Sequence, residues 1–403
     1  MQLNFDHLLD GTFTPSSDGD WDFLRAAAQN LFKPKTPVDD DKLFAGRIGQ
    51  INDLLDVVYE PGGHAIIFGE RGVGKTSLAK IIEKKIAPVI PNINVPEPIS
   101  CMTGDDFYKI WGNAFNNYRA GDTTPAQHFA NVGNPYEVIN ALSDLPQNKM
   151  HIFIFDEFDR VTDDTTYHLM ADMLKHLSNN PGKVTIIIVG VGDTLLDLFG
   201  KHESIVRCCE QIKMPRMSDA ECREIINERI PRIGFTVDHQ VTEQIIKLSQ
   251  GLPGYVHLLG QLVLKNAIEN RRTTIDESDL KIALSQALAK ADHKARSDYY
   301  KAISSSAADN KYKEVLIACA LAESNEMGSF YAGSIRDPYS KIRGKPMDIP
   351  NYSTNLSNLC SDERGPALIK TGKPKRYQYR FANPLVQPLA IMIGANEGLV
   401  PID

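Results

Sequence analysis

The chain has 403 residues, of which 42% are hydrophobic and 24% are charged, and this size allows two or three domains with ordinary cores. A net charge of −7 excludes general nucleic-acid binding by the whole chain, although residues 341–380 hold nine Lys or Arg against three Asp or Glu. No signal peptide and no apolar run of ~18–20 residues is recognisable, and the six cysteines form no Cys-x-x-Cys pair, so we expect a cytoplasmic protein with reduced cysteines and no membrane partner.

The first two segments differ in pattern. Residues 1–41 predict an N-terminal arm with a short helix near Trp21–Phe32, followed by Pro34 and Pro37, which discourage regular structure. Residues 42–215 alternate apolar runs with helical patterns, which is typical of a parallel α/β sheet. Three expected strands are apolar on both faces, as buried parallel strands must be: His64–Phe68, Met150–Phe155 and Val184–Val189. A further strand is expected near Ile99–Cys101.

The second half of the chain is mostly helical in pattern. Residues 216–300 predict a helical lid, in which Ser218 and Glu221 form a capping box and Gly251–Gly254 separates two helices. Residues 301–403 predict a domain of three helices, near 311–322, 329–340 and 352–360. Two strands, 366–370 and 377–381, should follow as a hairpin.

A phosphate-binding loop follows the first predicted strand. Gly69-Glu70-Arg71-Gly72-Val73-Gly74-Lys75-Thr76 matches G-x-x-x-x-G-K-[ST] in full, and Ser77 continues into a helix. Backbone N–H groups and the helix N-terminus would hold the phosphates of ATP. Lys75 would reach the β- and γ-phosphates, and the Thr76 hydroxyl would ligate Mg²⁺. The alternative is a chance match in a glycine-rich turn, which the flanking strand and helix disfavour.

Two acids end the strand Met150–Phe155. Asp156 can hold Mg²⁺ directly or through water, and Glu157 can orient and polarise the attacking water. The alternative is a pair of solvated acids at a strand end, which is common. The apolar strand before the acids favours the catalytic interpretation.

Two weaker candidates lie further along. Asp193, after the strand Val184–Val189, would sit beside the γ-phosphate, unless it is an incidental acid in a glycine-rich loop. Arg207 would reach the γ-phosphate of a neighbouring subunit and stabilise transition-state charge. A surface salt-bridge arginine is its alternative.

These motifs together resemble the AAA+ ATPases, and within them the origin-recognition and initiator branch. Leu43–Arg47 is similar to the adenine-side motif of that superfamily, Val189–Leu195 to its sensor-one segment, and Ser204–Arg207 lies in its arginine-finger region. Initiators usually carry Asn where this chain has Asp193. The resemblance implies an α/β P-loop AAA+ sheet with a helical lid, followed by a C-terminal winged helix.

The lid departs from that branch. Gly251-Leu252-Pro253-Gly254 lacks the sensor-two arginine that often follows the glycine turn. This stretch is similar to the Gly-x-Pro turn of STAND-type signalling ATPases, which implies that Pro253 packs near the adenine. The resemblance therefore also implies slow hydrolysis, with nucleotide acting as a switch.

The C-terminal hairpin carries cations at its tip. Lys373, Lys375 and Arg376 can lie along a phosphate backbone. On the third helix Leu356, Leu359 and Cys360 should face the core, which turns Asn355 and Asn358 outward toward base edges. The alternative is a winged helix that binds protein and carries a solvated basic loop.

The leading hypothesis is an AAA+ ATPase that binds ATP and Mg²⁺, self-associates and binds DNA. It would act in a mobile element, in replication or in antiphage defence. One rival is a STAND-like signalling switch whose winged helix binds an unidentified protein partner. A second rival is an assembly adaptor without turnover, against which Glu157 argues.

Overall fold

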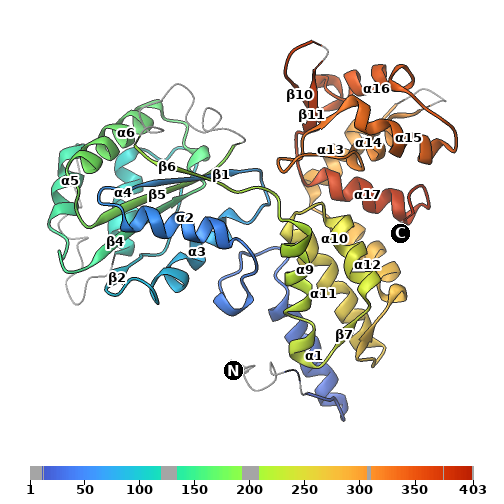
Figure 1. Ribbon diagram of the computed structural model, residues 1–403, viewed down its shortest axis with the longest axis horizontal. Helices are drawn as coiled ribbons and strands as arrows, with labels where there is room; N and C mark the ends of the chain where they lie inside the picture. Colours follow the sequence, from blue (N-terminus) through green and yellow to red (C-terminus); the bar gives the residue numbers. More distant parts are fainter. Residues whose placement is uncertain are drawn as a thin grey trace. The chain divides into compact units, whose positions relative to one another are not determined.

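The computed structural model describes residue 11 and residues 13–118, 134–192, 208–305, 310–374 and 376–401, which divide into two compact units (Figure 1). The sheet unit comprises Pro37–Glu70 and Gly74–Pro215. The helical unit comprises Met1–Thr36, Arg71–Val73 and Arg216–Asp403. Within the described ranges, helices that are both long and apolar enough to cross a membrane are absent.

The sheet unit is built on six parallel strands in the order β2-β4-β5-β1-β6, with β3 also paired to β4. The register pairs Ile67 of β1 with Val189 of β5, and Ile154 of β4 with Ile187 of β5. The strand order places these three strands, the longest of the sheet, at its centre. The strands are β1 (Ala65–Gly69), β2 (Ile93–Asn94), β3 (Ile99–Ser100), β4 (Met150–Asp156), β5 (Val184–Val191) and β6 (Glu210–Lys213).

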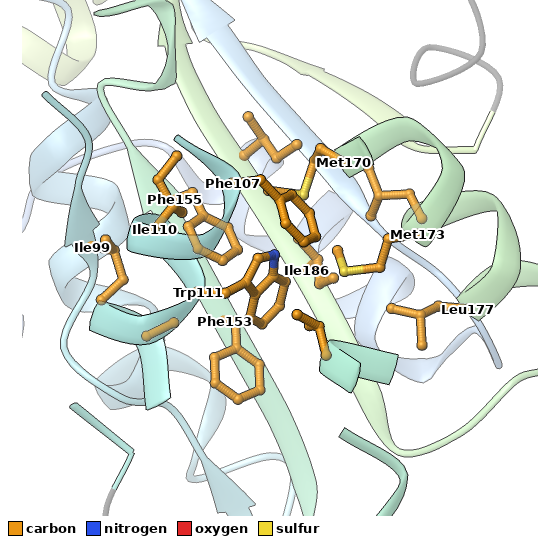
Figure 2. Packing of buried hydrophobic residues seen from close by; sticks show 14 of the residues in the cluster. Ile99, Phe107, Ile110, Trp111, Phe153, Phe155, Met170, Met173, Leu177 and Ile186 are labelled. Atoms are coloured by element: carbon orange, nitrogen blue, oxygen red, sulfur yellow. The ribbon is translucent and has the colours of Figure 1, made fainter. Parts of the chain in front are cut away.

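Helices cover this sheet because its central strands are apolar on both faces. On one face, Trp111 packs with Phe153, Phe155 and Ile186 in the core that Figure 2 shows. The helical segments are η2 (Asp41–Leu43), α2 (Ile48–Tyr59), α3 (Lys75–Ile86), α4 (Phe107–Asn117), α5 (Pro135–Ser143), η4 (Phe158–Arg160) and α6 (Asp164–Asn179).

The carboxyl ends of β1, β5 and β4 lie at one edge of the sheet, because these strands are neighbours and parallel. Gly69 ends β1, Val191 ends β5 and Asp156 ends β4. Ligands of open α/β sheets bind at this edge. The fold therefore brings the phosphate-binding loop and the acidic pair, distant in sequence, to the same side of the sheet.

The lid part of the helical unit includes the N-terminal helix α1 (Asp18–Leu31), which packs against α11 (Pro253–Glu269). Arg229, which is 1% exposed, links α1 to the helix Asp219–Asn227: its Nε donates to the carbonyl of Leu31 and its Nη1 to the carbonyl of Ile225, both at 2.9 Å. The predicted helix of the arm is thus present and packed on the lid. The remaining lid elements are α9 (Asp219–Asn227), η5 (Pro231–Ile233), β7 (Thr236–Val237), α10 (His239–Ser249), β8 (Thr274–Ile275), α12 (Glu277–Lys290) and α13 (His293–Ile303).

The C-terminal part is a winged helix with an added strand. Its antiparallel sheet has the order β10-β11-β9, and the closing helix α17 packs on α14. The elements are α14 (Tyr312–Ala320), β9 (Phe330–Tyr331), η6 (Ala332–Ile335), α15 (Arg336–Arg343), η7 (Ile349–Asn351), α16 (Ser353–Asn358), η8 (Asp362–Arg364), β10 (Leu368–Thr371), β11 (Gln378–Phe381) and α17 (Val386–Asn396).

The predicted helix at residues 329–340 is wrong at its start. Phe330 and Tyr331 form β9, which pairs with Tyr379 and Gln378 of β11. The Phe330 ring is 1% exposed and stacks on Tyr379 at 6.2 Å, so burial against the hairpin favours a strand here over a helical turn. The second helix of the domain begins only at Arg336.

Candidate nucleotide-binding site

The phosphate-binding loop requires glycine at its two ends. A Cβ on Gly69 would lie 2.3 Å from the carbonyl oxygen of Met214, so only glycine fits beside that strand. Gly74 has a φ of 98° and occupies the N-cap of α3 without a side chain to cap it. The first N–H groups of α3 are therefore left for an anion. Arg71, Gly72 and Val73 form the turn between these ends and group with the helical unit.

Lys75 is the buried cation of this loop. Its side chain is 7% exposed, and Nζ donates to the carbonyl oxygens of Gly69 at 2.8 Å and Glu70 at 2.7 Å. A buried ammonium requires such partners, because losing hydration without them is costly. These contacts hold the positive charge at the loop, where a triphosphate would meet it.

Asp156 and Thr76 supply neighbouring oxygen donors. The Asp156 carboxylate accepts a hydrogen bond from the Glu157 N–H at 2.8 Å. Burial raises the pKa of Asp156 above its ordinary value, and the nearby Thr76 hydroxyl partly offsets that rise. A hydroxyl and one carboxylate, completed by phosphate oxygens and water, are the donors that Mg²⁺ prefers. The residues present therefore fit a magnesium ion that bridges to ATP.

Glu157 begins the turn after β4 and is held by two residues that lie outside the sequence motifs. Its backbone is left-handed, with a φ of 55°, and its Oε2 accepts from Arg160 Nη1 at 2.8 Å and from Ser100 Oγ at 3.3 Å. Arg160 lies three residues after Glu157, a spacing that the sequence displays. Ser100 reaches Glu157 only because β3 pairs with β4.

The end of β5 connects the loop to the acidic turn. The Gly192 N–H donates to the Gly69 carbonyl at 3.3 Å, and the Val191 N–H donates to Asp159 Oδ1 at 2.8 Å. Asp193 follows directly, but Asp193 and Arg207 both lie outside the described residues. Their sensor and finger roles stay predictions.

Two further residues predicted to bind nucleotide have defined places. The Ser77 hydroxyl accepts a hydrogen bond from the Val38 N–H at 3.1 Å, which joins helix α3 to the segment before Leu43–Arg47. Pro253 is the first residue of α11 in the helical unit, with Leu252 at the N-cap. Contact of Pro253 with the adenine stays a prediction.

Comparison with known proteins places this site in a family. Residues 35–316, more than half of the chain, match the family described as Novel STAND NTPase 1. The chain belongs to this family. The predicted resemblance to AAA+ ATPases of the origin-recognition type, with STAND-like features in the lid, is confirmed by this match together with the relatives below.

Two archaeal relatives span most of the chain. The ORC1-type DNA replication protein of Thermoplasma volcanium is 23% identical over 338 residues, which cover 81% of this chain and 80% of that protein. The ORC1-type DNA replication protein 2 of Thermoplasma acidophilum is 23% identical over 340 residues, which cover 79% and 78%.

Two solved structures share the fold. The ORC2 protein of Aeropyrum pernix, in ADPNP–ADP complexes, aligns with a TM-score of 0.52 and 15% identity over 92% of this chain and 98% of that one. A Walker-type ATPase of Pyrococcus abyssi aligns with a TM-score of 0.56 and 18% identity over 89% and 99%. The predicted fold class, a P-loop AAA+ sheet with a helical lid and a winged helix, is confirmed.

The wing of this family member is a short hairpin. Thr371 pairs with Gln378 next to the turn, and the Arg376 N–H donates to the Lys373 carbonyl at 2.9 Å to close the turn. Lys373 and Arg376 are exposed, whereas Lys375 lies outside the described residues. Two predicted contacts are therefore accessible at the tip.

One of the two amides of α16 differs from its expected outward placement. Leu356 and Leu359 are buried as predicted, but Asn355 and Asn358 are both half-buried. The Asn358 amide donates to the Tyr312 hydroxyl at 2.7 Å, so the expectation that it projects into solvent is wrong. The short helix turns Asn358 toward α14, where a polar partner satisfies it.

Proposed function

We propose that this chain binds ATP with Mg²⁺ and hydrolyses it to ADP and phosphate. The observation that carries the proposal is the convergence at one sheet edge of the loop that holds Lys75, the neighbouring oxygen donors of Thr76 and Asp156, and Glu157. These are the parts that phosphoryl transfer to water requires: a phosphate cradle, a metal site and a base.

The roles follow from position. Lys75 would exchange its carbonyl partners for β- and γ-phosphate oxygens, and the first turn of α3 would donate to the same phosphates. Thr76 and Asp156 would hold Mg²⁺, which neutralises phosphate charge. Glu157 would accept a proton from water as the water oxygen attacks the γ-phosphorus and the bond to the β,γ-bridging oxygen breaks.

We further propose that the ATP-bound chain self-associates and that its wing engages duplex DNA. The exposed cations Lys373 and Arg376 support this, because exposed Lys and Arg bind backbone phosphates. The two Thermoplasma relatives are DNA replication proteins, which points in the same direction. Such an assembly would act in one of three settings: a mobile element, replication or antiphage defence.

Three measurements on the intact chain test this function. Calorimetry should give ATP binding that weakens when Mg²⁺ is removed, and a phosphate-release assay should give turnover. Light scattering should report a larger particle with ATP than with ADP. Absence of ATP binding would overturn the assignment of the loop; binding without turnover would leave a nucleotide-dependent assembly factor.

The family match favours one second function, an ATP-dependent signalling switch whose winged helix binds a protein. The Gly251–Gly254 turn, with Pro253 opening α11, is the feature that supports it. DNA titration at several salt concentrations separates the two. Electrostatic DNA binding weakens steeply with salt, whereas a protein-binding wing gives no DNA binding at low salt.

A further inference from the structure

A pocket lies where two helices of the lid part meet the closing helix of the winged helix. Its volume is about 300 Å³, at the lower end of the range for small-molecule sites. Helices α12 and α13 both pack against α17 within the helical unit (Figure 1). The described residues that line the pocket belong to these three helices and to Glu397, which follows α17, so the pocket is distinct from the sheet edge that holds the nucleotide site.

One part of the lining is apolar. Leu389 is buried, whereas Leu288 and Ile393 are half-buried and retain surface toward solvent. The Tyr300 side chain adds an aromatic surface that is 56% exposed, and its edge-on contact with the buried Tyr299 ring, at 5.5 Å between centroids, supports it. An apolar ligand that entered the pocket would remove this surface from water, which is favourable.

The available polar groups of the pocket are donors. The Arg296 side chain is exposed and has no hydrogen-bond or ion-pair partner among the residues that the structure describes. Asn396 Oδ1 accepts from Ser285 Oγ at 3.0 Å, which leaves the Nδ2 group to donate. Glu397, an acid of the lining, pairs with Lys313 of α14. Within the described lining, one positive charge is therefore left without a counter-charge.

The acids of α13 and its cap have partners of their own. Asp292 accepts from the Ala295 N–H at 2.9 Å and thereby caps the helix. Asp298 accepts from the side-chain amide of Asn383 at 2.8 Å. The Arg296 guanidinium is thus available to an anion from outside the chain.

We propose that this pocket binds a small organic carboxylate with an apolar body. Arg296 would hold the carboxylate, because the planar guanidinium fork matches its two oxygens, and the aliphatic lining would cover the body. A single free cation balances one negative charge, and Glu397 would repel a second, which favours a monocarboxylate over a phosphate dianion or a nucleotide. The ligand would contact helices of the lid part and of the winged helix together, and so stabilise their packing. This site is independent of the proposed ATPase function.

Methyl NMR on the intact chain tests the pocket with a matched pair of probes, 4-phenylbutyrate and its neutral amide, 4-phenylbutyramide. The two probes share one apolar body, but only the first is charged. Both should shift the labelled methyl resonances of Leu288, Leu389 and Ile393. The carboxylate should bind about three- to fivefold more tightly, which is the gain that an exposed ion pair gives.

Arg296→Gln separates the charge from the apolar body. It should weaken binding of 4-phenylbutyrate to the level of the amide and leave the affinity for the amide unchanged. Lys294→Gln, exposed on the same helix and outside the lining, is the matched control and should bind both probes as wild type does. Equal affinity of the wild type for the two probes, or an equal loss in the two variants, would overturn the assignment of a carboxylate to Arg296.

Three other results would overturn the pocket as a small-molecule site. The first is no methyl shift up to about 20 mM probe, well above the Kd of about 2 mM that a ligand of about twelve non-hydrogen atoms reaches at modest efficiency. The second is shifts confined to methyl groups outside the pocket. The third is a shift of the pocket methyls on raising the protein concentration or on adding duplex DNA, which would assign this face to a second copy of the chain or to nucleic acid. Because the readout needs no ATP, it stands or falls apart from the proposed hydrolysis.

Discussion

Lys75 and Lys373 are cations of two very different regions. Lys75 is 7% exposed, follows a buried strand and donates to two backbone carbonyls, whereas Lys373 is exposed on a hairpin turn of a separate unit. A buried ammonium needs polar partners, which two backbone carbonyls supply here, and we expect phosphate oxygens to replace them when ATP binds. An exposed lysine is hydrated by solvent and needs no partner, so the exposure of Lys373 permits a phosphate contact without implying one.

The same difference separates the acids from the amides. Asp156 and Glu157 end a central strand, and their backbone is fixed by β3, β5 and the buried Phe158. Asn355 and Asn358 lie on a helix of a single turn and a half, and the amide of Asn358 bonds within its own domain. The geometry of the sheet edge is therefore set by the fold, whereas the DNA contact that we propose for the wing domain has no such internal support.

The largest effect should come from the base. Glu157→Gln should lower kcat by about 10²–10⁴-fold while ATP binding is kept, because an amide cannot accept the proton of the attacking water. ATP-bound assemblies should then accumulate, which size-exclusion chromatography with ATP can detect. Glu83→Gln, at an exposed position of α3, is the matched control. Unchanged turnover in Glu157→Gln would remove the catalytic role of this residue.

The next effect concerns the buried cation. Lys75→Ala should weaken ATP binding about 10- to 100-fold, since hydrogen bonds to charged groups contribute about 1.5–3 kcal/mol each. Calorimetry with a slowly hydrolysed ATP analogue measures the loss. Lys80→Ala removes the same side chain from an exposed position of the same helix and should bind like wild type. Equal affinity in all three proteins would contradict the assignment of the phosphate-binding loop.

Local motifs made the sheet edge predictable. The phosphate-binding loop needs glycine at Gly69 and Gly74 for reasons of backbone shape, and the strand before Asp156 must be apolar to be central. Both requirements are visible over a few consecutive residues. The strands β1, β4 and β5 were accordingly predicted within a few residues of their ends.

Features that depend on distant partners were missed. Phe330–Tyr331 forms a strand because it pairs with β11, 47 to 49 residues later in the sequence, which buries Phe330. Two-residue strands such as β2 carry no alternation that a sequence pattern could show. The contact of Ser100 with Glu157 exists only through the pairing of β3 with β4. The prediction that Asn358 faces solvent was wrong because its amide donates a hydrogen bond to the hydroxyl of Tyr312, on another helix. The domain boundaries at residues 41, 215 and 300, and the roles of Asp193 and Arg207, stay predictions.

The smallest effect tests the wing. Replacing Lys373, Lys375 and Arg376 together by Ala should weaken duplex DNA binding to a similar degree for every sequence. Each phosphate that loses its cation should reduce the slope of log affinity against log salt by about 0.9, so three contacts give at most about 2.7. Fluorescence anisotropy at four or more salt concentrations measures both quantities. ATP binding should be unchanged, because the wing and the sheet belong to different units.

A matched triple variant makes this test decisive. Lys281, Lys290 and Lys294 are exposed on or beside α12 and α13, so changing them to Ala alters the net charge by the same amount on the same unit. If long-range attraction alone draws DNA to the helical unit, both triple variants should reduce the slope equally. A specific wing contact instead predicts a shallower slope for the wing variant and a near wild-type slope for the control.

Asn355→Ala should then change the preference among DNA sequences without changing the slope, because a contact to a base edge releases no counterions. If the wing variant binds DNA as wild type does at every salt concentration, the wing is not a DNA contact, and the signalling switch becomes the better account of this domain.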